Sequence, residues 1–223
     1  MRVVLSNVKL IINENVYVKD PESSALGKKI LNESILLIDE MGFEAFTFKK
    51  LGQKIESNES SIYRYFENKH KLLIYLTSWY WSWMEYRLVF ETANLESAHE
   101  RLKKAILLFT EEIEDDLSTE HINESVLQRI IISDFTKTIL TKEVDLENRN
   151  GFFLIYKRVI HRISQLIKEV NSNYPYPDSL ASSIIEGALH QHFLKQHLKS
   201  ITNCDDLITP ADFYMDMINK VLN

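Results

Sequence analysis

The sequence contains few of the residues that interrupt regular structure. Its 223 residues include one cysteine, five glycines and four prolines. Cys204 cannot form an internal disulfide, so nothing in the sequence requires an oxidising compartment. The scarcity of glycine and proline limits the number of tight turns, which favours long helices over a sheet of many strands. We therefore expect an all-α protein.

Signatures of membrane proteins and of enzymes are also missing. No apolar run approaches the roughly 18 residues that a membrane-spanning helix needs. No apolar core with a small-residue cleavage site follows Met1 and Arg2. The sequence has no glycine-rich phosphate loop, nucleophile elbow, HExxH or CxxC motif. We expect a cytoplasmic protein that is not an enzyme and that has neither a cofactor nor a membrane partner.

Three histidines form the one group that could suggest a metal site. His190 and His192 lie two positions apart on an expected helix and so point in different directions. His161 could join them from the preceding helix. The alternative is that all three are surface or interface histidines, and we predict no metal.

The chain is acidic, with a net charge of −6, which opposes binding to the phosphates of nucleic acid. The charge is distributed unevenly. From Ser23 to Leu72, eight lysine and arginine residues accompany seven acidic residues, so this segment has a net charge of +1. A local basic patch is sufficient for docking on DNA. Composition therefore leaves a DNA-binding segment open.

The segment Thr47–Lys71 predicts two short helices with a tight break, followed by the start of a longer helix. Thr47 is a suitable N-cap, because its hydroxyl can accept a bond from an amide of the first turn. Phe46 and Leu51 are spaced as a hydrophobic staple around that cap.

A second helix is expected from Glu59 to Phe66, with Asn58 as its N-cap and the break at Glu56. Ile62 and Phe66 share the face that we expect to be buried. The outward positions are small, aromatic or basic: Ser60, Ser61, Tyr63 and Arg64. Two short helices that meet in this way are typical of a helix-turn-helix.

The residues of this region resemble the N-terminal domain of TetR-family transcriptional regulators. The resemblance covers Lys28 to about Leu76. It rests on Gly42, Phe43, Phe46, Thr47, Leu51, Ile55, Ile62, Tyr63, Arg64, Tyr65, Phe66, Lys69 and Leu72, with an upstream core at Ile30, Leu31, Ser34, Ile35, Leu37 and Ile38. Glu56 and Glu59 depart from the family, which usually has glycine in the turn and a basic or small residue at the second position.

The resemblance implies a three-helix DNA-binding head at residues 23–72 on a helical ligand-binding and dimerisation body at residues 73–223. It also implies a homodimer that reads a palindromic operator, most often as a repressor that a ligand releases from DNA. The predicted DNA-binding residues are Thr47, Asn58, Ser60, Ser61, Tyr63, Arg64, Tyr65 and Lys69. Among these, Thr47, Tyr65 and Lys69 match positions that hold backbone phosphates in the family.

Residues 1–22 form an N-terminal arm that the resemblance does not explain. Its β-branched and apolar residues predict a strand or hairpin. The arm could touch DNA, or it could pack on the protein or bridge a dimer. We favour packing or bridging, because unpaired strand edges tend to find partners.

Aromatic residues line one side of the long helix that follows Asn68. They could form the wall of a ligand pocket or pack as core. The candidate pocket residues are Trp79, Trp83, Phe109, Phe135 and Tyr156. No lysine or arginine lies in these stripes, so we expect an uncharged or weakly polar, apolar ligand.

Further helices are expected at Glu96–Asp116, Asn123–Leu140 and Phe152–Val170, with a polar loop at Thr141–Gly151. The last two helices, Asp178–Ile201 and Thr209–Leu222, are expected to form a four-helix dimer interface with their copies. Ile184, Ile185, Ala188, Phe213, Met217 and Val221 would supply its apolar surface, and the small Ala181 and Ala188 would permit close approach. The alternative is that this surface only closes the core of one chain.

Two other functions fit parts of the sequence. One is a dimeric DNA binder without a ligand, which a solid body without a cavity would favour. The other is an all-helical enzyme or carrier that contains a helix-turn-helix, which the missing catalytic motifs oppose.

Overall fold

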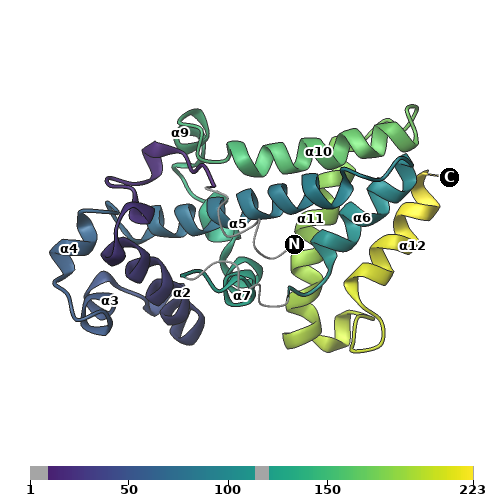
Figure 1. Ribbon diagram of the computed structural model, residues 1–223. Coiled ribbons are helices and arrows are strands. Elements are labelled where there is room, and N and C mark those ends of the chain that lie inside the picture. Colours follow the sequence, from purple (N-terminus) through teal and green to yellow (C-terminus); the bar gives the residue numbers. More distant parts are fainter. Residues whose placement is uncertain (1–9, 114–120, 223) are drawn as a thin grey trace. The chain divides into compact units, whose positions relative to one another are not determined.

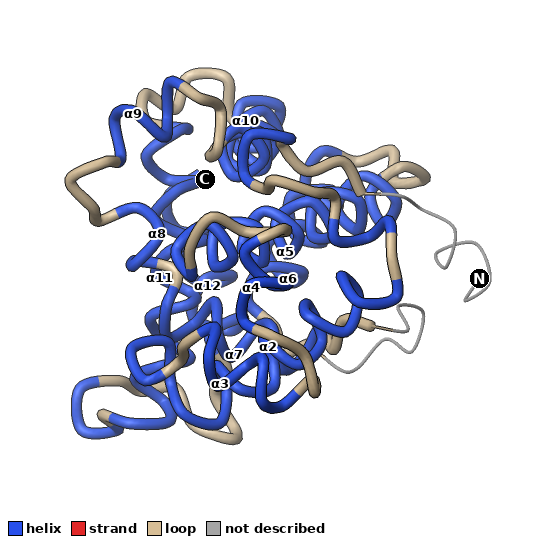
Figure 2. The backbone as a smooth tube through the Cα atoms, turned by 90° about the vertical axis from the view of Figure 1, so that its left-hand side faces the viewer, coloured by secondary structure: helices blue, strands red, loops and turns tan. Residues whose placement is uncertain are grey.

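The computed structural model describes residues 10–113 and 121–222, and every regular element in these ranges is a helix (Figures 1 and 2). The all-α prediction is confirmed. The chain divides into two compact units: residues 1–82 with 113–154, and residues 83–112 with 155–223. This division crosses the body expected at residues 73–223, and a domain border after residue 72 stays a prediction. Each helix in the described ranges is too short or too polar to span a bilayer.

The first unit contains the helix-turn-helix region. Its elements are the 3-10 helices η1 (Glu14–Val16) and η2 (Pro21–Ser23), the helices α2 (Ala25–Ala45), α3 (Phe48–Lys54), α4 (Glu59–Tyr63), α7 (Glu124–Asp134), α8 (Thr136–Ile139) and α9 (Val144–Arg149), and the first part of α5 (Lys69–Thr92). Helix α2 packs against α7 and α3, and α3 packs against α4. Each fully buried aliphatic or aromatic side chain of this core contributes about 1.5–3 kcal/mol.

Both ends of α2 follow from local chemistry. Ser24 caps its start, since its hydroxyl accepts a bond from the Gly27 amide at 3.1 Å. Gly42 interrupts the helical conformation with φ +77° and ψ 154°. Only glycine adopts these angles without strain, and a Cβ atom there would meet nothing within 4 Å. The backbone angle alone therefore explains the glycine.

The N-terminal arm is not a strand in its described part, so that prediction is wrong for residues 10–20. The side chains of Asn13 and Asp20 accept bonds from backbone amides two residues ahead and so favour short turns over a ladder. The Val18 amide donates to the Tyr65 carbonyl at 2.8 Å, and Asn13 Nδ2 donates to the Asn150 carbonyl at 2.9 Å. The arm therefore packs on the first unit. The apolar residues Val3–Leu5 lie outside the described residues.

The segment expected as the loop Thr141–Gly151 contains α9, so that prediction is also wrong. Tertiary contacts hold this segment in place. His70 Nε2 donates to the buried Glu147 carboxylate at 3.0 Å, and the Lys71 ammonium lies 3.7 Å from the ring centre of Phe152. A polar sequence pattern could not reveal partners that are about 70 to 80 residues away.

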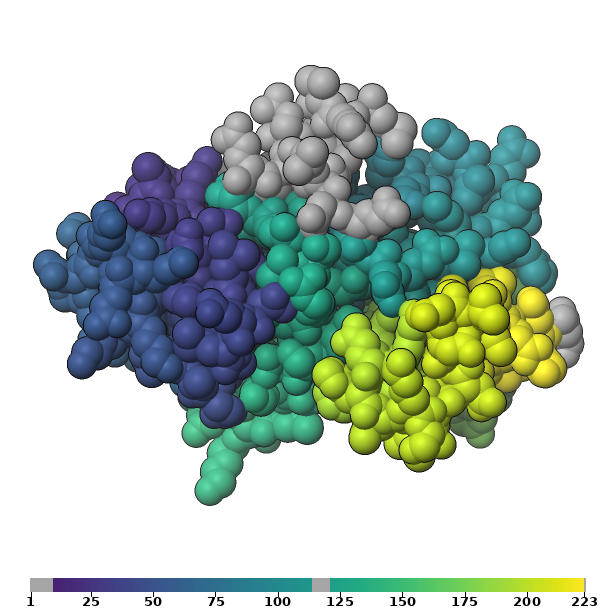
Figure 3. All heavy atoms as spheres, turned by 90° about the horizontal axis from the view of Figure 1, so that it is seen from below, coloured from purple at the N-terminus to yellow at the C-terminus, as the bar shows by residue number. Residues whose placement is uncertain are grey.

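The second unit is made of the rest of α5, α6 (Ala98–Thr110), α10 (Leu154–Val170), α11 (Pro177–His197), η3 (Lys199–Ile201) and α12 (Pro210–Leu222). Helices α6, α11 and α12 pack on one another, and α11 and α12 lie side by side in Figure 3. Thr209 and Asp212 cap the start of α12 reciprocally. Gly187 of α11 permits the close approach of Tyr214 of α12, because a Cβ atom on Gly187 would lie 2.1 Å from Tyr214 Oη.

An ion-pair cluster joins α5 and α10 within the second unit. Arg158 and Arg162 both donate to Glu85, with Nε to Oε1 distances of 3.1 and 2.7 Å. Burial raises the pKa of Glu85, but the hydrogen bonds from the two arginines outweigh this and leave the pKa below its ordinary value. Glu85 is therefore a charged, paired carboxylate.

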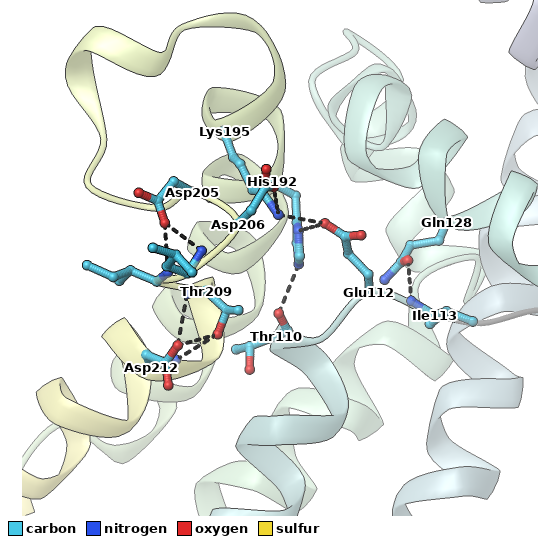
Figure 4. Close-up of polar contacts among 12 residues, drawn as sticks. Thr110, Glu112, Ile113, Gln128, His192, Lys195, Asp205, Asp206, Thr209 and Asp212 are labelled. Carbon is cyan, nitrogen blue, oxygen red and sulfur yellow. Dashed lines mark hydrogen bonds and ion pairs between the residues drawn. The ribbon is translucent and has the colours of Figure 1, made fainter.

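His192 is buried in the second unit, which corrects its interpretation as a surface or interface histidine. Its Nε2 donates to the Thr110 carbonyl at 2.9 Å, and its Nδ1 lies 3.9 Å from a Glu112 carboxylate oxygen (Figure 4). Lys195 Nζ holds the same Glu112 oxygen at 3.3 Å. In the described ranges, no three metal-ligating side chains lie close enough together to hold a metal ion.

The burial of His192 predicts a pH-dependent stability. Burial lowers the pKa of His192, so below the ordinary value of about 6.5 the unfolded chain binds a proton that the folded chain does not. Folding stability should therefore fall as the pH drops from 6.5 towards 5, by at most about 1.4 kcal/mol per pH unit. Urea unfolding at several pH values measures this change.

His192→Gln keeps a donor for the Thr110 carbonyl but does not titrate. We expect it to flatten the pH dependence between 5 and 6.5. His161→Gln, which changes an exposed histidine, serves as the control and should retain the wild-type slope. Equal slopes for wild type and His192→Gln would contradict the assignment.

Candidate nucleic-acid interface

The turn between α3 and α4 is closed by the backbone. The Ser57 amide donates to the Gly52 carbonyl at 2.9 Å, and a Cβ atom on Gly52 would lie only 2.8 Å from the Ser57 oxygen. Glu56 adopts φ +55°, a left-handed conformation that costs a residue with a side chain about 1–2 kcal/mol. Glu56 thus adopts a left-handed turn conformation at the position where the family described above usually has glycine.

Thr47, Leu51 and Ile62 occupy the places that the sequence predicts. Thr47 Oγ1 accepts a bond from the Lys50 amide at 3.2 Å and so caps α3. Leu51 and Ile62 are fully buried, as is Phe46 in the staple. Helix α4 ends at Tyr63, earlier than expected, because the next amides turn back onto the Ile62 carbonyl. The two helices and their turn form the predicted helix-turn-helix.

The outer surface of α4 has the predicted composition. Ser60, Tyr63 and Arg64 are exposed, and Ser61 is half-buried. The Tyr63 ring packs edge-on against Phe48 at 5.0 Å between centroids, which fixes its direction. Asn58 has the backbone conformation of an N-cap, but its side chain makes no cap bond and is exposed.

The basic residues around these helices fall into two groups. Three of them donate to backbone carbonyls: Lys29 to Ile55, Lys50 to Ala45, and Lys69 to Phe43, Glu44 and Phe46. By contrast, Lys49, Lys54 and Arg64 are exposed and make no hydrogen bond or ion pair with any part of the chain that the structure describes. The second group can approach phosphates without first losing a partner.

The helix-turn-helix region was compared with known protein families. Residues 30–76 match the family described as bacterial regulatory proteins, tetR family. The helix-turn-helix segment is thus that of a TetR-family DNA-binding transcription regulator, a class of proteins that are not enzymes. The comparison with curated proteins finds no match.

Solved structures show that the TetR-like fold extends over most of the chain. AibR, in complex with isovaleryl coenzyme A and operator DNA, is 16% identical; the match covers 87% of this chain and 98% of AibR, with a TM-score of 0.56. A candidate transcriptional regulator from Saccharomonospora viridis in complex with choline is 17% identical, covers 88% and 95%, and has a TM-score of 0.59. The superantigen PfiT is 17% identical, covers 92% and 99%, and has a TM-score of 0.60. At this identity the likeness concerns the fold alone.

Two of the residues predicted to hold phosphates, Tyr65 and Lys69, have protein partners in this structure. Tyr65 is 4% exposed and its hydroxyl lies 2.8 Å from Ser24 Oγ, so it is part of the core rather than the surface. Lys69 has its ammonium on three carbonyl oxygens. The DNA contacts predicted for these two residues stay predictions. Thr47 also stays a predicted contact, and it caps α3 from an exposed position.

The five predicted pocket residues do not gather in one unit. Trp79 and Phe135 belong to the first unit, where Phe135 packs edge-on against Trp81 at 5.5 Å between centroids. Trp83, Phe109 and Tyr156 belong to the second. Neither of the two clefts described in the second unit, of about 240 and 330 Å³, is lined by any of these three residues. The aromatic pocket stays a prediction.

Sequence reasoning missed Lys49 and Lys54 as candidates for phosphate contact. The signal was present, because the buried positions Phe48, Leu51 and Ile55 leave both lysines on the outer side of α3. In a helix-turn-helix, the first helix crosses the DNA backbone, where lysines at these positions are useful.

Lys54→Gln should weaken binding to DNA of any sequence. If Lys54 neutralises one phosphate, the slope of log K against log salt should become shallower by about 0.9. Titration of a mixed-sequence 30-base-pair duplex at several salt concentrations, by fluorescence anisotropy, measures this slope. Lys103→Gln makes the same charge change on α6 in the second unit and should leave the slope unaltered. Equal slopes for Lys54→Gln and wild type would remove Lys54 from the interface.

Proposed function

We propose that this TetR-family regulator acts as a homodimeric repressor on a palindromic operator, and that binding of a small molecule releases it. The proposal of a homodimer rests on the exposed apolar surface of α12. Phe213 and Val221 are 45% and 38% exposed, and the half-buried Met217 lies between them at the same helical spacing. The adjacent face of α12 is buried in the second unit through Tyr214 and Ile218. An apolar stripe that borders the buried face of α12 is therefore exposed.

A second copy is the occupant that best explains this outer stripe. Two identical stripes related by a twofold axis cover each other, as in most symmetric dimers. A cleft of about 330 Å³ continues the apolar surface beside Phe213 and is lined by Ile201 and Ile208, which are also exposed. Two heads per molecule would then address two half-sites in successive major grooves.

The contribution of α11 differs from the expected one. Ile184, Ile185, Ala188 and Ala181 are at most 1% exposed, because they face the core of their own unit. These four residues therefore pack inside one chain, as in the alternative to a dimer interface. The outer face of α11 is polar instead, with Ser183, Glu186, His190 and His197 exposed. We propose that α12 supplies the apolar centre of the dimer interface and α11 its polar margin.

Release by a small molecule is supported by chain continuity. Helix α5 is one helix from Lys69 to Thr92, and it contributes to both compact units. A ligand that prefers one arrangement of α5 over another would change how the heads bind DNA. Structures of this fold contain isovaleryl coenzyme A in AibR and choline in the Saccharomonospora viridis protein.

Selection of bound fragments from the DNA of its own genome tests the proposed function. We expect an inverted repeat whose half-sites lie about one helical turn apart, since two symmetric heads must face the same side of DNA. An asymmetric site bound by one chain would contradict the proposal. With the selected operator as the probe, compounds that dissociate the complex should also change tryptophan emission. If none of a broad panel does so, the ligand-independent alternative is favoured.

Phe213→Asp should convert the dimer to a monomer. A carboxylate in the centre of the apolar stripe would have to be buried without a partner, which should weaken dimerisation roughly a hundredfold or more. Sedimentation at micromolar concentration measures the assembly state. Phe90→Asp places the same charge at a phenylalanine of α5 with nearly equal exposure, 43% against 45%, and should leave the dimer intact. A stable dimer of Phe213→Asp would place the interface elsewhere.

A further inference from the structure

The chain between α2 and α3 has an unusual set of hydrogen-bond partners. Four successive carbonyl groups, those of residues 43–46, accept bonds from lysine side chains. Lys69 Nζ lies 2.9, 3.1 and 3.2 Å from the carbonyl oxygens of Phe43, Glu44 and Phe46. Lys50 Nζ lies 2.7 Å from the Ala45 carbonyl. The carbonyls that the end of a helix leaves without amide partners are thus satisfied by two ammonium groups.

The ammonium of Lys69 has no donor left for another partner. It carries three N–H groups, and three carbonyl oxygens surround it. It also lies 4.7 Å from the centre of the Phe43 ring, so an aromatic face covers part of the remaining space. A DNA phosphate could bind this group only after a carbonyl had been released.

The bonded segment determines where the helix-turn-helix begins. Gly42 turns the chain out of α2, and Thr47 caps α3 five residues later. Between them, the Phe43 and Phe46 side chains are buried at 7% and 0% exposure. Because Lys69 is the first residue of α5, its ammonium ties the start of α5 to the end of α2 and the entry to α3.

We propose that Lys69 is a positioning residue that fixes the α2–α3 link and thereby the orientation of α3 and α4, and that it does not contact DNA phosphate. This inference rests on the DNA-binding function. Phosphate contact would instead fall to Lys49, Lys54 and Arg64, which are exposed. The two roles make opposite predictions about salt dependence and about the mobility of the link.

Lys69→Met separates the two roles in the full-length protein. Methionine retains an unbranched side chain that can lie on Phe43, but it has no donors. We expect the amides of Phe46 and Leu51, which bond to Gly42 and Thr47, to exchange with solvent about tenfold faster. Hydrogen exchange requires no DNA, so this readout stands even if the proposed repressor function fails. Amides of α11 provide the internal reference and should be unaffected.

The salt slope for the mixed-sequence 30-base-pair duplex gives the second readout. Lys69→Met should keep the wild-type slope, whereas Lys54→Gln should lower it. Lys69→Arg keeps the charge, but its planar guanidinium cannot donate to three carbonyls from one nitrogen. It should therefore also accelerate exchange at Phe46 and Leu51 while keeping the slope, and it covers the case in which Lys69→Met does not fold. A slope reduced by about 0.9 in Lys69→Met, or unchanged exchange in both variants, would overturn the proposal.

Discussion

Backbone carbonyl groups at the end of a helix must find donors, and the end of α2 finds them in two lysine side chains. Gly42 makes this end abrupt, because its backbone angles leave the helical region. The carbonyls that follow then point to Lys69 and Lys50, while Phe43 and Phe46 enter the core. The cap at Thr47 and the two helices beyond it therefore follow a short segment that is fixed in two ways. Its carbonyl groups bond to lysines, and its two phenylalanine side chains are buried.

This arrangement has an electrostatic consequence for a protein with a net charge of −6. Ammonium groups that bond to carbonyls are not placed on phosphates, so the segment 23–72, with its net charge of +1, has few cations left for DNA. The strength of nonspecific binding follows the number of phosphates neutralised. We therefore expect a single head to bind DNA weakly, and pairing two heads would compensate. The apolar stripe on α12 is consistent with that requirement.

What could be predicted from sequence was local. Thr47, Ser24 and Thr209 cap helices through atoms within three residues of themselves, and the cap at Thr47 and the helix-turn-helix spacing agree with the prediction from sequence. The failures involve partners that are distant in the chain. The burial of Ile184 and Ile185 in their own unit depends on tertiary packing that helical periodicity does not contain. The carbonyls that hold Lys69 are more than 20 residues away, and a lysine at a helix start has the same sequence signature whether it grips a phosphate or a backbone.

The two kinds of comparison differ in how much of the chain they cover, and the physics of the two regions explains the difference. The family model matches residues 30–76, whereas the structural matches extend over 87–92% of the chain at 16–17% identity. The matched segment needs particular residues at fixed spacing: a glycine at positive φ, a capping hydroxyl and a staple of two apolar side chains. The remaining helices need only apolar stripes of suitable volume, which many sequences supply. The body is therefore free to differ in the side chains that line its clefts, so the identity of a ligand must be sought in this chain's own residues.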